Sequence, residues 1–376
     1  MKAATPTVSE GRETRVVFYF GVFAPVGGIE RFALNLLDGL SELGVKARLV
    51  CSARLGWLPT ETRFQSVRAA YVPGGFFHVS DWLLLFLHGR REIRWASAVI
   101  FGKLLPRPIL RILRKCRKPE TRFIFVTSYA PVATTPGEAE RLRTNLEWFD
   151  VIVVQAESFR RTLLDAGVQI PIQVLPYPLE KELDSPAKDL PPGPPWRIGF
   201  LGRLEPQKTL EVLFEAVSLL KRPDLELHLY GSGSQQDKLR ELARTLSMAG
   251  RIFFHGAIPH ASVPEAVQDN HLFAFSSREE GQVLAALEIL ACGRPIAATP
   301  AGALADILAD PRLGFCAETC GSVSLAAAIA DVLARLGKGS LTPEIIRASF
   351  HERWDRRTIL AGYARLLDAS LPPAAP

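Results

Sequence analysis

Short apolar runs alternate along the chain with segments of helical periodicity. The first run, 15–22, is rich in β-branched and aromatic residues, which is typical of a buried parallel strand. The segment 30–43 then carries apolar side chains at helical spacing and is followed by Gly44, a residue type favoured just beyond a helix C-terminus. Strand, helix and strand in this order predict a parallel sheet with helices on both faces.

The same alternation continues through both halves of the chain. Further strands are predicted at 45–51, 98–101, 122–127, 151–154, 197–200, 225–230, 252–255, 272–276 and 295–299. Helices are predicted between the later strands, at 210–220, 235–247, 263–269 and 283–292, and an amphipathic segment covers 353–369. The pattern predicts an α/β protein built from two Rossmann-like halves.

A Pro-rich segment separates the two halves. Residues 184–196 contain five prolines, and proline removes backbone donors and stiffens the chain, so no central strand or helix is expected there. We therefore predict an N-terminal domain over 1–183, a linker over 184–196 and a C-terminal domain over 197–350. The amphipathic tail, 351–376, could pack back across the domain junction.

Composition narrows the class of protein. Of 376 residues, 48% are hydrophobic and 22% are charged, which indicates a globular chain and excludes a disordered one. The five cysteines lack the paired spacing of a zinc site. Because the first 15 residues have no apolar stretch and no apolar run approaches the length of a membrane span, we expect a cytoplasmic protein, with peripheral binding to the inner face of a membrane as the alternative.

The net charge of +6 is concentrated in one segment. Residues 82–122 hold eleven Lys or Arg against two Glu, interleaved with large apolar side chains. This mixture fits contact with an anionic membrane surface, and it also fits an ordinary helix pair with a solvated basic face. Nucleic acid is not the expected partner, because no zinc finger or aromatic stacking motif accompanies the charge.

Four loops that follow predicted strands carry candidate chemistry, and parallel sheets bind ligands beyond the carboxyl ends of their strands. The first has Gly27 and Gly28 before a helix, which suits an anion at close range. The second has Arg203 and Lys208, a guanidinium fork and a point charge that together suit a diphosphate. Each feature alone also fits a tight turn or exposed surface cations.

The third loop, Tyr-Gly-Ser-Gly at 230–233, lacks the third glycine of a dinucleotide fingerprint, so Gly231 is interpreted as a close-approach turn. The fourth has Glu280 after a strand, with Gly281 expected to open a helix. Glu288 then lies within that helix among apolar residues. A carboxylate there is costly to bury without a polar partner, and a ribose diol is a suitable one.

Together these motifs resemble the retaining glycosyltransferases of family 4, which have the GT-B fold. The resemblance covers nearly the whole chain. It is carried by Gly-Gly-Ile-Glu-Arg at 27–31, Gly-Arg-Leu-x-x-x-Lys at 202–208, Tyr-Gly-Ser-Gly at 230–233, Phe-His-Gly at 254–256, and two glutamates separated by seven residues before Ala-Cys-Gly-x-Pro. The resemblance implies two Rossmann-like domains that face a central cleft.

The resemblance also implies a role for each motif. Arg203 and Lys208 would hold the donor diphosphate, Glu280 would contact the donor sugar and Glu288 the ribose. The remaining expected donor-binding residues are Gly281, Gln282, Val283, Gly231, Gly256 and Ile258, and the Gly27–Gly28 loop would face phosphates and acceptor. No cofactor is expected, and the lack of an Asp-x-Asp pair fits a site that uses Arg and Lys in place of a metal.

The sequence departs from the family pattern at three places. Gln282-Val283 stands where Phe-Gly is usual, Ser128-Tyr129 where many members have a histidine, and Tyr177-Pro178 where Asn-Gly is usual. The predicted function is transfer of a sugar, with retention, from a nucleotide sugar to a glycan or lipid-linked acceptor such as a cell-envelope glycan. Two alternatives are a hydrolysing nucleotide-sugar epimerase of the same fold and a catalytically degenerate GT-B binding protein.

Overall fold

The computed structural model describes residues 14–22, 28–53, 68–73, 89–127, 135–180, 188–281 and 283–367. Its chain forms two compact units: Met1–Pro178 together with Arg356–Pro376, and Leu179–Asp355. The Pro-rich segment 184–196 therefore falls inside the second unit. The C-terminal segment returns to the first unit.

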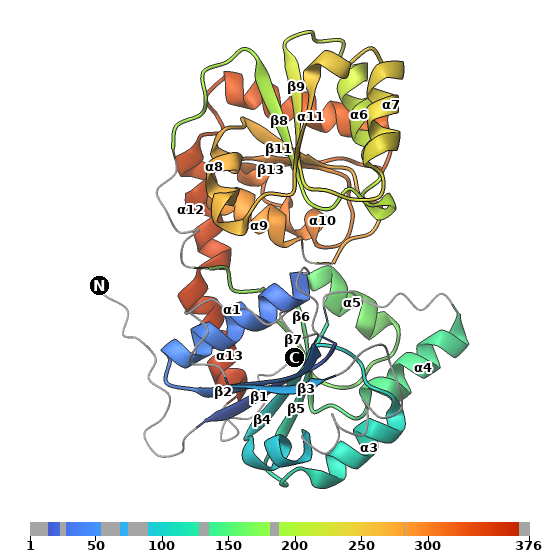
Figure 1. Cartoon of the computed structure of the whole chain (residues 1–376), viewed down its shortest axis with the longest axis vertical. Helices are drawn as coiled ribbons and strands as arrows, with labels where there is room; N and C mark the ends of the chain where they lie inside the picture. Colours follow the sequence, from blue (N-terminus) through green and yellow to red (C-terminus); the bar gives the residue numbers. More distant parts are fainter. Residues whose placement is uncertain are drawn as a thin grey trace. The chain divides into compact units, whose positions relative to one another are not determined.

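The first unit is built on a seven-stranded parallel sheet in the order β3-β2-β1-β4-β5-β6-β7 (Figure 1). Its strands are β1 Arg15–Val22, β2 Lys46–Ala53, β3 Arg68–Pro73, β4 Ala98–Phe101, β5 Arg122–Val126, β6 Val151–Val154 and β7 Ile172–Val174. β4 and β6 are buried along their whole length, as expected for central parallel strands with helices on both faces. The strand order reverses between β1 and β4.

The helices of this unit are α1 Gly28–Glu42, a helix over 89–95, α3 Arg107–Cys116, α4 Pro136–Leu146, α5 Glu157–Asp165 and α13 Arg356–Leu367. α13 packs on α1, and the absence of a side chain at Gly39 permits this, because an added Cβ would lie 2.5 Å from Leu360. Tyr363 of α13 is fully buried and donates a hydrogen bond to the Leu175 carbonyl at 3.2 Å. The last helix is thus part of the first unit's core.

The second unit has a six-stranded parallel sheet in the order β10-β9-β8-β11-β12-β13. Its strands are β8 Trp196–Leu201, β9 Leu225–Tyr230, β10 Ile252–Gly256, β11 Leu272–Phe275, β12 Ile296–Ala298 and β13 Gly314–Cys316. The order reverses between β8 and β11. Because crossovers between parallel strands are right-handed, helices before and after the reversal cover opposite faces of the sheet.

The helices of the second unit are α6 Leu210–Leu219, α7 Gln236–Thr245, α8 Val263–Gln268, α9 Leu284–Ala291, α10 Ala303–Ile307, α11 Ser322–Gly337 and α12 Pro343–Trp354, with short 3-10 turns η3 Pro206–Lys208, η4 Ala249–Arg251, η5 His260–Ser262 and η6 Pro311–Leu313. α6 packs with α7 and α11, whereas α9 packs with α8 and α12. These two groups form the two helical layers (Figure 1).

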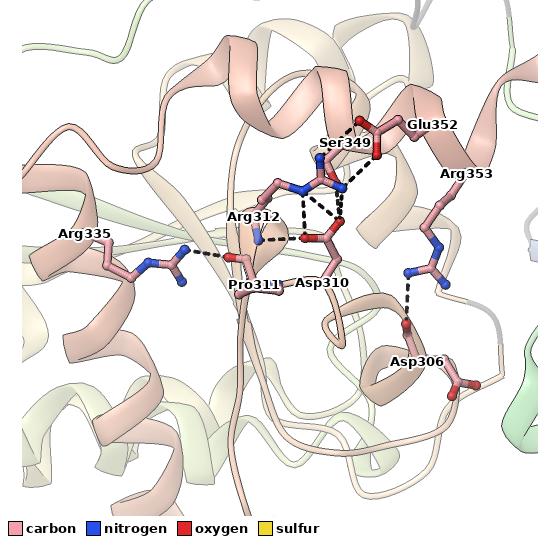
Figure 2. Close-up of polar contacts among 8 residues, drawn as sticks. All are labelled: Asp306, Asp310, Pro311, Arg312, Arg335, Ser349, Glu352 and Arg353. Carbon is pink, nitrogen blue, oxygen red and sulfur yellow. Dashed lines mark hydrogen bonds and ion pairs between the residues drawn. The ribbon is translucent and has the colours of Figure 1, made fainter.

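A network of ionic and hydrogen-bonded groups fastens α12 to the turn before β13 (Figure 2). Arg312 bonds to the carboxylates of both Asp310 and Glu352, and buried Ser349 donates to Asp310 at 2.6 Å. The hydrogen bonds from Arg312, followed by that from Ser349, lower the pKa of the Asp310 carboxyl well below its usual value. Arg335 and Arg353 add bonds to the Pro311 and Asp306 carbonyls.

The buried Arg294 fixes the described part of the Pro-rich segment. Its guanidinium is fully buried and donates to the carbonyl oxygens of Lys188 at 3.0 Å and Asp189 at 2.9 Å, and also to those of Gln268 and Asn270. Burial lowers the pKa of Arg294 to about 10. The chain entering β8 is therefore tied to the loop between α8 and β11.

Candidate active site

The reversal of strand order between β8 and β11 opens a place for a ligand beyond their carboxyl ends. The loop after β8 holds Arg203 and Lys208, and the loop after β11 holds Glu280. Two hydrogen bonds join these loops directly: Ser276 Oγ donates to the Lys208 carbonyl at 2.9 Å, and Thr209 Oγ1 donates to the Ser276 carbonyl. The predicted basic and acidic motifs are therefore brought together at the switch point.

Lys208 and Glu280 form an ion pair in this place. Lys208 Nζ contacts Glu280 Oε1, and their side chains are 16% and 8% exposed. Ser277 Oγ donates to the same carboxylate oxygen at 2.5 Å. A largely buried ion pair with an added hydroxyl donor is held in one geometry, so both charges are presented in fixed positions.

The loop after β12 supports the Glu280 backbone. Thr299 Oγ1 donates to the Ser277 carbonyl at 2.6 Å. Gly302 has a φ of +56°, and a Cβ at that position would lie 1.8 Å from the Glu280 carbonyl oxygen. Only glycine permits this approach of the two loops.

The loops after β8, β9 and β10 are joined through glycines. Gly231 N–H donates to the Gly256 carbonyl at 2.7 Å, and Gly202 N–H donates to the Tyr230 carbonyl at 3.0 Å. A Cβ on Gly231 would lie 1.8 Å from the Gly202 carbonyl oxygen. The prediction that Gly231 is a close-approach turn therefore has a physical reason: backbone from the neighbouring loop occupies the space of its side chain.

Arg203, in the loop after β8, is exposed. Beside it, Glu205 accepts hydrogen bonds from Ser234 Oγ at 2.7 Å and Ser234 N–H at 3.2 Å. These bonds, together with the charge of Arg203, lower the pKa of Glu205. The loop that carries Arg203 is thus anchored, while the guanidinium faces solvent.

Glu288 is buried and has a polar partner. Its Oε1 lies 2.9 Å from His260 Nε2, and His260 Nδ1 lies 3.3 Å from Glu180 Oε2. Glu180 and Glu288 are both buried, and each is 8% exposed. Hydrogen bonding to Glu180, and then to Glu288, raises the pKa of His260 to about 9, so this imidazole is a cation at neutral pH.

The remaining predicted residues lie in loops of the second unit, at the start of α1 in the first unit, or outside the described residues. Gly281 and the Val283 side chain are buried, whereas Gly256 and Ile258 are partly exposed in the loop after β10. Gln282 and Gly27 fall outside the described residues, as do Ser128 and Tyr129. Gly28 is the first residue of α1, which follows β1 at the reversal point of the first sheet.

One local prediction is wrong. Gly281 does not open a helix, because α9 begins at Leu284 after Val283, whose φ of −79° and ψ of 92° are extended. Residues 276–281 instead form an irregular loop held by the hydrogen bonds to Lys208, Thr209 and Thr299. Glu288 consequently lies one turn into α9.

Four polar residues at this edge were not predicted from the sequence: His260, Glu180, Ser277 and Thr209. Ser277 stands three residues before Glu280 and His260 two residues after Ile258, so both were close to motifs that had been identified. Glu180 and His260 are separated by 80 positions, and their contact depends on the tertiary fold. A buried carboxylate on an apolar helix was the signal that a partner for Glu288 was required.

The basic segment is described from residue 89 onward. α3 buries Leu110 and Leu113 and exposes Arg107, Arg111 and Lys115, with Ile112 between them at 43% exposure. Leu104, just before the helix, is 40% exposed. One face of α3 therefore combines positive charge with apolar surface, whereas residues 82–88 lie outside the described part.

Within the described ranges, no helix is long and apolar enough to cross a membrane. Among the same residues, no group of three or more His, Cys, Asp or Glu side chains is placed to hold a metal ion.

Comparisons with known proteins agree with this geometry. Residues 182–338 match the family model "Glycosyl transferases group 1". The chain is 28% identical over 367 residues to the lipopolysaccharide core biosynthesis glycosyltransferase LpsE of Rhizobium meliloti, covering 94% of this chain and 98% of that protein. It is 29% identical to a D-inositol 3-phosphate glycosyltransferase of Mycobacteroides abscessus over 48% of this chain and 41% of that protein.

Two solved structures share the fold. HepE of Anabaena, in complex with UDP, superposes with a TM-score of 0.78 at 16% identity over 95% of this chain and all of that one. The lipopolysaccharide outer core galactosyltransferase WaaB superposes with a TM-score of 0.76 at 15% identity over 95% of this chain and all of that one. The protein therefore has the GT-B fold, and its residues 182–338 are similar to the group 1 glycosyl transferases, glycosyltransferase family 4.

Proposed function

We propose that this glycosyltransferase transfers a sugar from a nucleoside diphosphate sugar, with retention of configuration, to a glycan acceptor of the cell envelope. The observation that carries the donor assignment is the ion pair between Lys208 and Glu280 at the switch point of the second sheet, with Arg203 exposed in the same loop as Lys208. Fixed cations and a carboxylate in that place suit a diphosphate and a polar sugar.

Each residue has a proposed role in the reaction. Lys208 and Arg203 bind the donor diphosphate and stabilise the negative charge that grows on it as the bond to the sugar breaks. Because Lys208 is already held by Glu280, this charge stabilisation needs little rearrangement of the site. No metal is required in this proposal, since two cationic side chains supply the charge.

Glu280 and the loop around it are proposed to orient the donor sugar. The carboxylate accepts hydrogen bonds from sugar hydroxyls while Ser277 and Lys208 keep it in place. Gly281, Gln282 and Val283 border the sugar. Glu288 accepts hydrogen bonds from the ribose, and Gly231, Gly256 and Ile258 border the base.

The acceptor assignment rests on similarity. LpsE, which matches nearly end to end, is described as acting in lipopolysaccharide core biosynthesis, and WaaB as an outer core galactosyltransferase. HepE was solved with UDP, which makes UDP-sugars the first donors to test. The loop with Gly27 and Gly28, which precedes α1 in the sequence, is proposed to contact the acceptor and phosphates.

A thermal-shift screen against UDP-, GDP-, ADP- and dTDP-sugars, with EDTA present, tests the donor site. A ligand at one hundred times its Kd adds about 2.7 kcal/mol to the free energy of unfolding, so the correct donor raises Tm measurably. We expect Lys208→Ala and Arg203→Ala to weaken donor binding by at least about tenfold, because each removes a charged contact.

The matched control is Lys238→Ala, an exposed cation on α7 of the same unit. If the donor raised Tm equally in the wild type and in all three variants, the diphosphate would bind elsewhere. Donor binding without turnover over a broad set of lipopolysaccharide acceptors would instead favour a degenerate binding protein. Released or epimerised sugar without an acceptor would favour an epimerase.

The exposed face of α3 is proposed to contact an anionic membrane surface near the acceptor. Exposed Arg107, Arg111 and Lys115 each contribute roughly 1 kcal/mol beside anionic lipid, and Ile112 and Leu104 add apolar contact. Replacing Arg111 and Lys115 with Gln should lower co-sedimentation with vesicles containing phosphatidylglycerol, while leaving unfolding unchanged. Binding that ignores either the charge of the lipid or these substitutions would contradict this proposal.

A further inference from the structure

A half-buried imidazole that no sequence motif identified joins two carboxylates in the second unit. His260 lies in η5, after β10, and faces Glu288 of α9 on one side and Glu180 on the other. All three belong to the unit 179–355. Each carboxylate is 8% exposed, so the histidine lies between two largely buried acidic side chains.

The protonation state follows from the geometry. A neutral imidazole has one N–H and can donate to one carboxylate, whereas the imidazolium has two and can donate to both. Two buried carboxylates on opposite sides favour the charged form, and the pKa of His260 is accordingly raised to about 9. The group is therefore a cationic bridge with two charge-assisted contacts.

The bridge fixes the orientation of Glu288. His260 Nε2 engages Oε1 at 2.9 Å, and no residue in the described ranges bonds to Oε2. A carboxylate held by one oxygen keeps its second oxygen, and a further lone pair on the first, as acceptors in a defined direction. Two neighbouring hydroxyls, such as those of a ribose, match this arrangement.

We infer that His260, held in turn by Glu180, is a positioning residue that orients Glu288 to read the 2′-hydroxyl of the donor's ribose. The inference rests on the proposed function in one respect, namely that Glu288 binds the ribose. Its new content is that ribose selectivity depends on a bridge formed by two residues from outside the glutamate motif. Removing either bridging residue should therefore weaken selection of the ribose without removing the carboxylate that contacts it.

The test measures binding by isothermal titration calorimetry with UDP and 2′-deoxy-UDP, and with GDP and 2′-deoxy-GDP in parallel. The ratio of the two Kd values in each pair isolates the contribution of the 2′-hydroxyl. A hydrogen bond to a charged group predicts a preference for the ribonucleotide of about tenfold or more in the wild type. Glu288→Gln should remove most of that preference.

His260→Phe keeps a ring and removes both N–H donors, and Glu180→Gln keeps the size of its side chain and removes the charge that holds the far side of the imidazole. Both should reduce the ribose preference severalfold, with the larger loss for His260→Phe. The control is His228→Phe, because His228 is also a partly buried histidine next to a glutamate, Glu226, in the same unit. It should keep the wild-type ratio.

A pH series supplies a second readout. The wild-type ratio should hold at neutral pH and fall as pH rises through about 9, where the imidazole loses one of its two donors. Ionisation of the base cancels in the ratio, because both nucleotides of a pair carry the same base. His260→Phe should show no such fall.

The outcomes separate the inference from the proposed function. If Glu288→Gln keeps the ribose preference, the ribose site itself is wrong. If Glu288→Gln removes it while His260→Phe and Glu180→Gln stay within twofold of the wild type, the bridge has no positioning role and the ribose site stands. Should His260→Phe fail to fold, Glu180→Gln and the pH series still decide the question.

Discussion

At the scale of single residues, Gly302 constrains the backbone of Glu280, a proposed donor-binding residue. It lies after β12, in a different loop from Glu280, yet the space of its side chain is taken by the Glu280 carbonyl oxygen. Its φ of +56° and ψ of −132° are also unfavourable for any residue with a Cβ. The Glu280 backbone can therefore occupy its position only because residue 302 has no side chain.

Gly302→Ala should displace the loop that carries Glu280. We expect a loss of roughly 1–3 kcal/mol in the free energy of unfolding and a larger relative loss in kcat, measured by urea denaturation and by donor turnover. Gly250→Ala is the control, because its added Cβ meets no atom within 4 Å. Similar kinetics in the two variants would mean that the Glu280 loop is not held by this contact.

The sequence predicted the charged residues of the candidate site and could not show how they are paired. Lys208 and Glu280 were assigned to separate contacts with the donor, and the structure places them in contact with each other. Likewise Glu288 required a polar partner because it sits on an apolar helix, but nothing in the sequence pointed to His260. Such pairings depend on side-chain positions across separate loops, which periodicity and motif spacing do not encode.

At the scale of elements, the strands with continuous apolar sequence were the predictable ones. β1, β4 and β6 coincide with their predicted ranges, since buried parallel strands have a distinctive composition. β9 also coincides, although its apolar residues alternate with Glu226 and His228. β3, β7 and β13 were not predicted. All three are edge strands of their sheets, and β7 and β13 have three residues each, too few for a periodicity to emerge.

Arg294 holds the segment before β8 in place, although hydrophobic periodicity gives no reason for a buried arginine at this position. Its guanidinium crosslinks the segment before β8 to the loop before β11 through backbone carbonyls. Arg294→Met should leave these carbonyls without donors and lower the free energy of unfolding by at least about 2 kcal/mol. Chemical denaturation measures this.

The control for Arg294→Met is Arg244→Met on α7, where the side chain is 66% exposed and bonds to Glu241. That variant should change stability by less than about 0.5 kcal/mol. Equal effects of the two substitutions would mean that the carbonyls around Arg294 find other partners.

At the scale of the whole molecule, the chain passes from the first unit into the second and returns with α13. Phe32 of α1 stacks on Tyr177 with ring centroids 4.0 Å apart, and Tyr363 of α13 lies 6.1 Å from Phe32. This aromatic cluster is assembled from the beginning, the middle and the end of the sequence. The core of the first unit is therefore incomplete without its last helix.

Tyr363→Ala should loosen the first unit and leave the second unchanged. Removal of a fully buried aromatic ring costs about 3–5 kcal/mol, so amide hydrogen exchange should accelerate in α1 and β1, with β11 and α9 unaffected. Tyr363→Phe should cost only about 1 kcal/mol, the hydrogen bond to the Leu175 carbonyl. Uniform acceleration over both units would show that the two unfold together.

The return of α13 also fixes the order in which the units can be completed during synthesis on the ribosome. Every residue of the second unit, 179–355, is made before α13, so that unit can close its core while the first still lacks the helix that covers α1. The first unit, although translated first, is finished last. Through that interval its apolar surface around Phe32 is exposed to chaperones, and a nascent chain arrested before residue 356 would carry a complete second unit and an unfinished first unit.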